Sequence, residues 1–476
     1  MRRTKILATL GPASESEDVL RAMIKEGLNG VRCNFSHGTA ADHQARIELI
    51  RRVAREEGVS VGILADLQGP KIRVAKFKNG FVMLEQNQKF IVDYSLPKDI
   101  GDTHQVGADY EHLHKDVKPG DLLLLDDGKI IFTVEKIQGT AVHCCVTVGG
   151  KLSNNKGINK RGGGLTAPAL TEKDKVDLKT AAALNVDFVA VSFPRGPEDM
   201  LEARALLTEA GSSAWLIAKV ERHEAVEHMD ALISSCDGVM VARGDLAVEI
   251  GEEYVPGVQK KLIQRSRDLD KIVITATQMM ESMITSPVPT RAEVSDVANA
   301  VLDGSDCVML SAETAVGEYP VKVINAMDRV CRAAEQHALE MLSCQREQAH
   351  FARVDEAIAM ATMYIANHLD VKAILALTES GSSVLWMSRV NSSLMIYALT
   401  RNLETMGRMT LVRGVMPVHF DSTRMPKDYV HREATELLVK KNVLHHGDWV
   451  LLTSGDHMGT HGGTNQLKVL KIGDVL

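Results

Sequence analysis

Two carboxylates and a lysine lie within apolar runs of the sequence. Lys219 and Glu221 end the run WLIAKVE, and Asp245 lies in the next run, GVMVARGDL. A charge inside a buried strand is costly unless it is paired or binds a ligand. If the two runs form neighbouring strands, the carboxylates lie about one inter-strand spacing apart, ~4.8 Å. Such hard oxygen ligands suit Mg²⁺ or Mn²⁺; the alternative is a pair of salt bridges in which Lys219 and Arg243 are the partners.

Three cations are expected around the same position. Arg32, Arg73 and Lys219 would neutralise the charge on the oxygens of a phosphoryl group during its transfer. The alternative is a solvated surface cation, which describes most of the 55 Lys and Arg residues. It describes Lys219 less well, because this lysine lies inside an apolar run.

Common nucleotide-binding and hydrolase motifs are missing from the sequence. It contains no G-x-x-x-x-G-K-[ST] loop, no G-x-G-x-x-G after a strand, and no Ser/His/Asp or Cys/His pattern. The glycine run RGGGL (161–165) is more typical of a flexible hinge than of a phosphate loop. His37, in the turn SHG, fits a turn residue without a role as well as a ligand contact.

Eight short apolar runs can position the reactive residues. Most are separated by segments with apolar residues at i, i+3, i+4 and i+7, which predicts strands alternating with helices and hence a closed (β/α)8 TIM barrel. The runs are 5–11, 30–36, 61–67, 188–193, 215–221, 238–246, 271–278 and 307–314. In such a barrel catalytic groups lie at the carboxyl ends of the strands. The polar residues found there are Arg32, Asn34, Ser36, His37, Asp66, Lys219, Glu221, Arg243, Gly244, Asp245, Thr277, Gln278, Ser311 and Glu313.

Two further regions depart from the barrel pattern. Residues 71–167 alternate apolar and polar residues between D-G and G-G turns, which predicts an inserted β-barrel domain that acts as a lid. Residues 346–476 alternate strand and helix patterns, which predicts a C-terminal doubly wound α/β domain. The barrel would then consist of residues 1–70 and 168–345.

Composition excludes several classes of protein. The net charge of -7 leaves no general attraction for nucleic acid or anionic membranes. No apolar stretch is long enough to span a bilayer, and the amino terminus lacks a cleavable signal pattern. Seven cysteines without a C-x-x-C pair leave no complete disulfide framework and favour a reducing, cytoplasmic location.

Six motifs, in order, resemble those of the pyruvate kinase family. They are VRCNFSHG (31–38), ADLQGPKIR (65–73), IAKVER (217–222), MVARGDLAVEI (240–250), TATQMMESM (275–283) and MLSAET (309–314). The resemblance covers essentially the whole chain. It implies transfer of phosphoryl from phosphoenolpyruvate to ADP, giving ATP and pyruvate, in a homotetramer that uses Mg²⁺ or Mn²⁺.

The resemblance also implies roles for individual residues. The catalytic group would comprise Lys219, Arg32, Arg73, Thr277 and Ser311, and the divalent ligands would be Glu221 and Asp245. The substrate would contact Arg32, Lys219, Gly244, Asp245 and Thr277, and the nucleotide would contact Asn34, His37, Arg73 and Lys156. A monovalent cation would be held by Asn34, Ser36, Asp66 and Leu67. The donor that protonates the enolate remains open between Thr277, Ser311 and a bound water.

Four positions depart from the family pattern. Leu67 stands where threonine is common, and Ala247 and Ala312 stand where glycine is usual. Lys71 stands where many members have glutamate. Its ammonium can take the place of the potassium ion, which predicts activity without added potassium; the alternative is a solvent-facing lysine.

A regulatory site is predicted in the C-terminal domain. In LALTESGSSVLW (375–386), a strand passes through a loop into a helix, and the loop amides and hydroxyls could hold a phosphate. The alternative is helix capping by serine. The predicted effector contacts are Thr378, Ser380, Gly381, Ser382 and Ser383, with His457 and His461 in the following glycine-rich loop (454–465) as further candidates. Glu379 would repel a second phosphate, which favours a sugar monophosphate as activator.

Two other functional classes compete with this interpretation. Barrel lyases and aldolases that handle an enolate also use a metal held by two carboxylates, but they need no nucleotide lid. A sensor without catalysis is disfavoured by the intact Lys219, Glu221 and Asp245.

Overall fold

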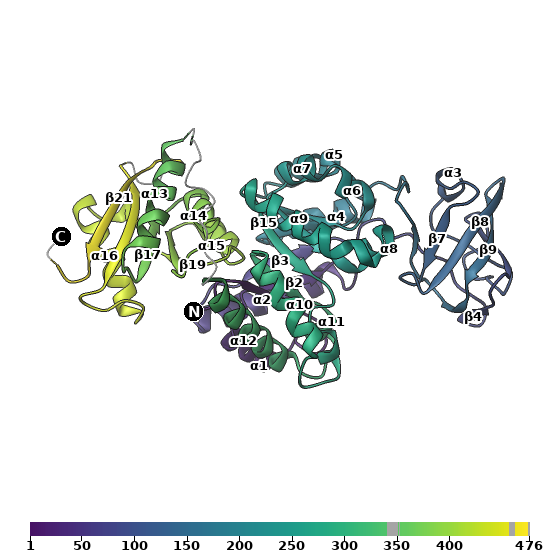
Figure 1. Ribbon diagram of the computed structural model, residues 1–476, viewed down its shortest axis with the longest axis horizontal. Helices are drawn as coiled ribbons and strands as arrows, with labels where there is room; N and C mark the ends of the chain where they lie inside the picture. The colour runs from purple at the N-terminus through teal and green to yellow at the C-terminus, as the bar shows by residue number, and fades with distance from the viewer. Residues whose placement is uncertain (340–350, 352, 457–461, 475–476) are drawn as a thin grey trace.

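The computed structural model describes residues 1–339, 351, 353–456 and 462–474. Three bodies lie in a row, with the barrel between the inserted β domain and the C-terminal α/β domain (Figure 1). The β domain lies beyond one end of the barrel and the C-terminal domain lies at the other. The two ends of the barrel therefore face different neighbours.

Eight parallel strands close into the predicted barrel, in the order β1-β16-β15-β14-β13-β12-β3-β2. Closure comes from the pairing of the first and last strands, where Lys5 is opposite Cys307. The strands are nearly all apolar and buried on both faces, as parallel strands covered by helices must be. Their bounds are β1 Lys5–Thr9, β2 Gly30–Asn34, β3 Gly62–Asp66, β12 Phe188–Val191, β13 Trp215–Val220, β14 Gly238–Ala242, β15 Ile272–Ala276 and β16 Cys307–Leu310.

The barrel helices begin at strong amino-terminal signals. Thr39, Thr171 and Thr290 each form a capping box with the acidic residue three positions later. The helices are α1 Glu17–Lys25, α2 Ala40–Glu56, α4 Glu172–Ala183, α5 Pro197–Glu209, α6 His223–Glu227, α7 Met229–Ser234, α8 Arg243–Ile250, α9 Val255–Asp268, α10 Arg291–Leu302, α11 Ala312–Ala315 and α12 Pro320–Leu339, with 3₁₀ turns η1 Glu252–Tyr254 and η2 Glu281–Ile284.

All eight strands end earlier than the apolar runs predict, and the last three show why. β14 ends at Ala242, and the following RGDL is the first turn of α8. β15 ends at Ala276, and Thr277 and Gln278 adopt φ of 66° and 52°. β16 ends at Leu310, and Ala312 begins α11. The polar ends of these runs are therefore turns and helix starts at the barrel rim, where side chains can face a ligand.

The inserted domain is all β, apart from the short helix α3 Leu113–Asp116. An open six-stranded sheet has the order β11-β7-β8-β9-β5-β6, and β10 pairs with β4 in a second sheet. Side chains from both sheets share one apolar core. The strands are β4 Phe81–Leu84, β5 Lys89–Asp93, β6 Gln105–Val106, β7 Leu122–Leu125, β8 Ile130–Gln138, β9 Ala141–Val148, β10 Gly150–Ser153 and β11 Ile158–Lys160.

The C-terminal domain is the predicted doubly wound sheet, in the order β19-β18-β17-β20-β21 with β21 antiparallel to β20. One face of the sheet packs on α13 and α14 and the other on α16, so two apolar cores flank it. Its elements are α13 Val354–His368, β17 Ala373–Leu377, α14 Ser382–Ser388, β18 Ile396–Thr400, α15 Leu403–Met409, β19 Val415–His419, η3 Ser422–Arg424, α16 Lys427–Lys440, β20 Trp449–Gly455 and β21 Thr464–Lys471.

The C-terminal domain docks on the amino-terminal end of the barrel. Arg389 forms an ion pair with Asp306, which precedes β16, and both side chains have 0% exposure. Lys5, at the start of β1, donates to the backbone oxygen of Val415 in β19. α15 approaches so closely that a Cβ atom on Gly407 would lie 1.7 Å from Oδ1 of Asp187. Close backbone contact and buried charges thus join the two domains.

Two expectations about the whole chain can be compared with this structure. Within the described residues, every helix is too short or too polar to cross a membrane. The six described cysteines, Cys33, Cys144, Cys145, Cys236, Cys307 and Cys331, are free thiols, and Cys344 lies outside the described residues.

Candidate active site

A cavity of about 480 Å³ opens at the carboxyl ends of β2, β3, β12 and β13. It brings together most of the residues that the sequence singled out. Its lining is Arg32, Asn34, Ser36, His37, Asp66, Leu67, Gln68, Lys71, Arg73, Asn155, Ser192, Phe193, Lys219, Glu221 and Asp245.

Lys219 is the centre of the charged wall. Its Nζ lies 3.2 Å from Oδ1 of Asp66 and 3.0 Å from Oε1 of Glu221, and it donates to Oγ of Ser192 at 2.7 Å. The burial of this ammonium favours its neutral form, but Asp66 and Glu221 outweigh burial and raise the pKa of Lys219. Lys219 therefore stays charged and faces the cavity.

The two carboxylates beside Lys219 differ in their electrostatics. Burial pushes the pKa of Asp66 up, but Lys219 and Arg32 outweigh burial and leave that pKa below its ordinary value. The pKa of Glu221 is raised, first by burial and then by the charges of Asp245 and Asp66, and Lys219 offsets this only in part. Glu221 is therefore a carboxylate with too little positive charge around it.

Asp245 lies in the first turn of α8 and pairs with Lys71, whose Nζ is 3.0 Å from Oδ1. Burial lowers the pKa of Lys71, but Asp245 outweighs it and raises this pKa. Lys71 thus contacts a predicted divalent-metal ligand, while 31% of its side chain stays exposed to solvent. Arg243 pairs with Asp296 at 2.6 Å and not with Asp245. Of the two rim salt bridges predicted as the alternative, only the pair of Lys219 with Glu221 is therefore present.

The arginines of the cavity come from two domains. Arg32 donates through Nε to Asp66 at 2.6 Å and through a terminal nitrogen to Thr9 at 3.1 Å, which fixes its guanidinium at the end of β2. Arg73 follows the lid linker, and its backbone N–H donates to Asp109 at 2.7 Å. Its side chain contacts the backbone oxygen of Lys71 at 3.2 Å. A residue of the inserted β domain therefore lines one cavity together with barrel residues.

Thr277 borders the start of α8. Its hydroxyl accepts from the N–H of Gly244 at 3.1 Å and donates to the backbone oxygen of Ala276 at 2.6 Å. Positive φ is strained for a β-branched residue such as Thr277. Strain of this kind persists only where the surroundings enforce it, and it is enriched at functional sites. Gly244 and Asp245 line an adjoining cavity of about 780 Å³ between the barrel and the β domain.

Like Gly244 and Thr277, the predicted residues Lys156 and Ser311 lie outside the lining of the 480 Å³ cavity. Lys156 belongs to the β domain and pairs with Asp126 at 2.8 Å. Ser311 follows β16, and its backbone N–H donates to Glu313 at 2.7 Å. Neither lines that cavity.

Sequence reasoning missed Ser192 and Phe193, which follow β12 directly. Ser192 joins Lys219 to the backbone oxygen of Leu67, to which its hydroxyl donates at 2.7 Å. Phe193 has φ of 56° and donates its N–H to Oε2 of Glu221 at 2.9 Å. Their position at the end of the fourth apolar run could have identified them as site residues. Gln68 and Asn155 lie in connecting segments, where the sequence offers no such signal.

Glu221 and Asp245 fit a divalent cation. They face one cavity, Asp245 raises the free energy of charging Glu221, and Lys219 compensates only part of that repulsion. Within the described residues there is no cluster of three or more His, Cys, Asp or Glu side chains suited to a metal. Two carboxylates with substrate oxygens and water are, however, sufficient for Mg²⁺.

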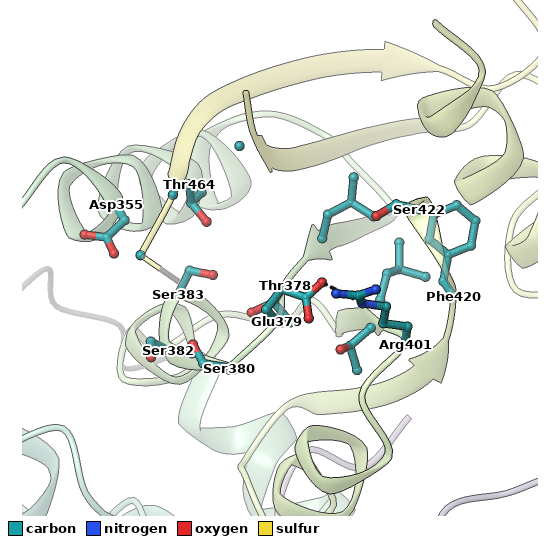
Figure 2. Close-up of a pocket in the computed structure, with 16 residues that line it drawn as sticks. Asp355, Thr378, Glu379, Ser380, Ser382, Ser383, Arg401, Phe420, Ser422 and Thr464 are labelled. Carbon is teal, nitrogen blue, oxygen red and sulfur yellow. Dashed lines mark hydrogen bonds and ion pairs between the residues drawn. The ribbon is translucent and has the colours of Figure 1, made fainter. Parts of the chain in front are cut away.

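The predicted effector loop lines a pocket in the C-terminal domain (Figure 2). Thr378, Ser380, Ser382 and Ser383 lie on one side of it, and Gly381, with φ of 85°, turns the chain into α14. Sequence reasoning missed Arg401, which follows β18 and whose Nε lies 3.3 Å from Oε1 of Glu379. Since α14 has seven residues, its dipole is a weaker attraction for an anion than this guanidinium. His457 and His461 lie outside the described residues.

Comparison with known proteins agrees with this geometry over the whole chain. The family model of the pyruvate kinase barrel domain matches residues 1–324, and that of the pyruvate kinase alpha/beta domain matches residues 356–470. Pyruvate kinase II of Salmonella typhimurium is 54% identical over 476 residues, with 99% of each chain covered. Pyruvate kinase of Haemophilus influenzae is 52% identical over 475 residues, which cover 99% of this chain and 98% of the relative.

A third relative, pyruvate kinase of Buchnera aphidicola subsp. Schizaphis graminum, is 49% identical over 478 residues, with 99% of each chain covered. These matches confirm the resemblance found in the six motifs and set aside the lyase and sensor alternatives. The chain therefore belongs to the pyruvate kinase family and is a transferase of the pyruvate kinase class.

Proposed function

We propose that the cavity at the barrel mouth transfers the phosphoryl group of phosphoenolpyruvate to ADP, giving ATP and pyruvate. The observation that carries this proposal is the position of Lys219, a buried ammonium held by Asp66 and Glu221 on the wall of an open cavity. An ammonium preorganised in this way stabilises charge on the phosphoryl oxygens without reorganisation. Arg32 and Arg73 supply further positive charge on either side of the transferred group.

The divalent ion belongs to the same proposal. Glu221 and Asp245 would hold it, and when bound it would supply positive charge beside the transferred phosphoryl group. Phe193 orients Glu221 through its backbone N–H, and Ser192 orients Lys219. These two residues hold the charged groups at the spacing that the substrate needs.

The substrate carboxylate is assigned to the start of α8. The backbone around Gly244 and Asp245 and the hydroxyl of Thr277 converge there, and the helix start favours an anion. Thr277, Ser311 and a water remain the three candidates for the proton donor to the enolate. In this structure the Thr277 hydroxyl proton is engaged with Ala276, so it must turn before it can be donated.

The monovalent pocket is assigned to Asn34, Ser36, Asp66 and the backbone of Leu67, which lie around one part of the cavity. Lys71 lines the same cavity, and its ammonium group lies beside Asp245. An internal ammonium here substitutes for the positive charge of potassium, so potassium is not required. The nucleotide contacts are assigned to Asn34, His37, Arg73 and Lys156.

The wider assignments follow the family. The domains are residues 1–70 and 168–345 for the barrel, 71–167 for the lid and 346–476 for the regulatory domain. The enzyme works in the cytoplasm as a homotetramer. The C-terminal pocket binds a sugar monophosphate that activates the barrel.

Support for the effector assignment comes from the pocket lining. Seven residues with hydroxyl groups and the Arg401 guanidinium line it beside the carboxylates of Asp355 and Glu379, and hydroxyls with a guanidinium suit a phosphate group (Figure 2). Among the described residues of the lining, the ion pair of Arg401 with Glu379 leaves no spare cation for a second phosphate, which favours a monophosphate.

The catalytic proposal is tested by a coupled assay of ATP formation from phosphoenolpyruvate and ADP, with and without Mg²⁺. Glu221→Gln and Asp245→Asn each abolish turnover and leave the far-ultraviolet circular dichroism unchanged, because an amide is a poor ligand for Mg²⁺. Near-normal activity of either variant at ordinary Mg²⁺ would defeat the assignment.

The effector assignment is tested separately with Ser380→Asp and Ser382→Asp. Hexose and pentose monophosphates are titrated at subsaturating phosphoenolpyruvate, and activation is expected to be lost in both variants because of charge repulsion. Ser393→Asp, at an exposed site outside the pocket, is the matched control. Activation that survives both pocket substitutions would remove this loop as the effector site.

A further inference from the structure

Asp174 is a buried carboxylate that the proposed reaction leaves without a role. It is the third residue of α4, the helix that follows the inserted domain, and its exposure is 0%. Its Oδ2 accepts from the N–H of Thr171 at 2.9 Å and from the Thr171 hydroxyl at 2.5 Å, as in an ordinary capping box. The capping box uses one oxygen of this buried group, so the second oxygen must be satisfied elsewhere.

The second oxygen of Asp174 holds the loop that follows β3. Oδ1 accepts from the N–H of Gly69 at 3.0 Å, although the two residues lie 105 positions apart. Gly69 comes three residues after the end of β3 and has φ of 67°, in the left-handed region that glycine adopts without strain. One carboxylate thus holds the chain both where it leaves the barrel and where it returns, so the contact lies within the barrel and not in the inserted domain.

Gly69 lies directly against Ser192. A Cβ atom on Gly69 would lie 2.7 Å from Cβ of Ser192 and 3.0 Å from its backbone oxygen, which is closer than a side chain tolerates. The Ser192 hydroxyl donates at 2.7 Å to the backbone oxygen of Leu67, two residues before Gly69, and accepts from Nζ of Lys219 at 2.7 Å. The loop therefore fixes Ser192 both by packing and through Leu67, and Ser192 in turn orients the ammonium of Lys219.

The capping boxes of α2 and α10 show that this second contact is not part of the capping motif itself. Asp42, in the first turn of α2, is exposed and uses Oδ2 for both the N–H and the hydroxyl of Thr39, each at 2.8 Å. Glu293, in the first turn of α10, also accepts from the N–H of Ser282 at 2.7 Å, in the loop that follows β15. The boxes of α4 and α10 thus hold the loop after the preceding strand in addition to their own helix.

We propose that Asp174 is a positioning residue for phosphoryl transfer, which acts on Lys219 through Gly69 and Ser192. It holds the loop after β3 in place, and this loop holds the Ser192 hydroxyl that accepts from Lys219. Without the contact the loop can shift and the hydroxyl can turn, so the ammonium loses one of its fixed neighbours. A displacement of about 1 Å at a catalytic group can cost about 10²-fold in rate, and a looser position is expected to cost about tenfold.

This inference rests on the proposed role of Lys219, and its variants separate positioning from capping. Asp174→Asn leaves one acceptor oxygen, which is expected to stay with the two donors of Thr171, so the amide NH2 faces the N–H of Gly69 and that contact is lost. Thr171→Val does the reverse, because it removes the capping hydroxyl and leaves the N–H of Gly69 on Asp174. Asp42→Asn, the same change in the exposed capping box of α2, is the matched control.

Two reactions are measured on the full-length protein: ATP formation in a single turnover, followed by rapid quench, and tritium exchange into pyruvate. Asp174→Asn is expected to slow ATP formation about tenfold and to leave tritium exchange within about twofold of the parent, because a misplaced Lys219 affects phosphoryl transfer more than enolate protonation. Thr171→Val and Asp42→Asn are expected to leave both rates within about twofold, although Thr171→Val lowers the urea midpoint of unfolding through the lost cap.

A double-mutant cycle with Ser192→Ala tests whether Asp174 acts through Ser192. In the Ser192→Ala background, Asp174→Asn is expected to cost less than about twofold in ATP formation, whereas an independent structural role would again cost about tenfold. Such additivity would overturn the proposal, as would equal losses of ATP formation and tritium exchange in Asp174→Asn. Asp174→Ser, whose side chain is too short to reach Gly69, replaces Asp174→Asn if that variant does not fold. Failure of the role of Lys219 would show itself differently, as equal losses of both reactions in Lys219→Met.

Discussion

The two ends of the barrel both bury charged side chains, but they satisfy them to different degrees. At the amino-terminal end, Asp306 accepts from Arg389 at 2.9 Å and from the N–H groups of Val273 and Arg413, each at 3.0 Å. At the carboxyl end, Glu221 is close to Lys219 but also to two other carboxylates, Asp66 and Asp245. The Asp306 carboxylate is electrostatically satisfied and the Glu221 carboxylate is not.

The pKa directions express this difference. Burial pushes the pKa of both Asp306 and Glu221 upward. Arg389 outweighs burial for Asp306, whose pKa is lowered, whereas Lys219 does not do so for Glu221, whose pKa is raised. A buried carboxylate with a raised pKa beside an open cavity thus marks a site that needs another cation, while a lowered pKa in a closed interface marks a structural ion pair.

The largest effect is expected from a substitution beside Glu221, at the carboxyl end of the barrel. Lys219→Met is expected to lower the rate of phosphoryl transfer by 10³-fold or more, roughly, because it removes a preorganised charge from the transition state. Enolate protonation, followed as tritium exchange into pyruvate, is expected to survive much better. If exchange fell as steeply as ATP formation, the separate role of Lys219 would be wrong.

Removal of the Arg389–Asp306 ion pair, at the amino-terminal end of the barrel, is expected to lower stability instead. Arg389→Met leaves the Asp306 charge buried without its main partner, so the free energy of unfolding is expected to fall by about 3 to 5 kcal/mol. Urea denaturation measures this. Lys89→Met, in the exposed pair with Glu135, is the matched control and is expected to leave the free energy of unfolding nearly unchanged, because an exposed ion pair is screened by water. Equal costs for the two variants would contradict the comparison.

Asp187 tests the same rule inside the domain interface. Burial raises the pKa of this carboxyl to about 7, and Ile63 donates its N–H to it at 2.8 Å while Gly407 packs against it. The neighbouring charges are Arg51 from α2 and Arg408 and Glu404 from α15. Because the pKa is raised, its contribution to stability is fully present below the ordinary value of 3.8 and is lost as the pH rises through about 7.

The change in the free energy of unfolding caused by Asp187→Asn is therefore expected to be more favourable at pH 8 than at pH 5. The expected difference is at most about 2.6 kcal/mol, because the pKa lies about two units above pH 5, and it is smaller than this because the residue is half-buried and partly screened by water. It is obtained by subtracting variant and parent unfolding free energies at each pH. Asp370→Asn, at an exposed site, controls for general charge effects. A difference that does not change with pH would show that Asp187 is charged throughout.

The smallest effect is expected from a substitution of Lys71, at the carboxyl end of the barrel. The unmodified enzyme is expected to be active without added potassium, and Lys71→Glu is expected to make its rate depend on potassium about tenfold, since glutamate restores the need for an external cation. Rates are compared in potassium chloride and choline chloride at equal ionic strength. A strict potassium requirement in the unmodified enzyme would rule out this role for Lys71.

Much of the fold followed from one-dimensional patterns. The eight apolar runs, the β insertion and the C-terminal α/β region correspond to the barrel and the other sheets of the structure. Periodicity could not locate the point where β14 becomes α8, because ARGDL continues the apolar run while its backbone turns into a helix. The open six-stranded sheet of the insertion was likewise hidden, since its strand order depends on long-range pairing.

For the site, strand ends predicted which residues share one rim but not which of them touch. Lys219 beside Glu221 could be anticipated from their spacing along one strand. The contact of Lys71 with Asp245 joins residues 174 positions apart and depends on the course of the lid linker. Arg401 could not be found from the effector loop, because it follows the neighbouring strand β18.

The place of the lid in the chain has a consequence for how such an enzyme could arise. The whole insertion lies in the single connection between β3 and α4, and β3 is paired directly with β12, the strand that follows α4. No barrel strand is interrupted, so an ancestral barrel with an ordinary short loop at this point could have acquired the domain in one step.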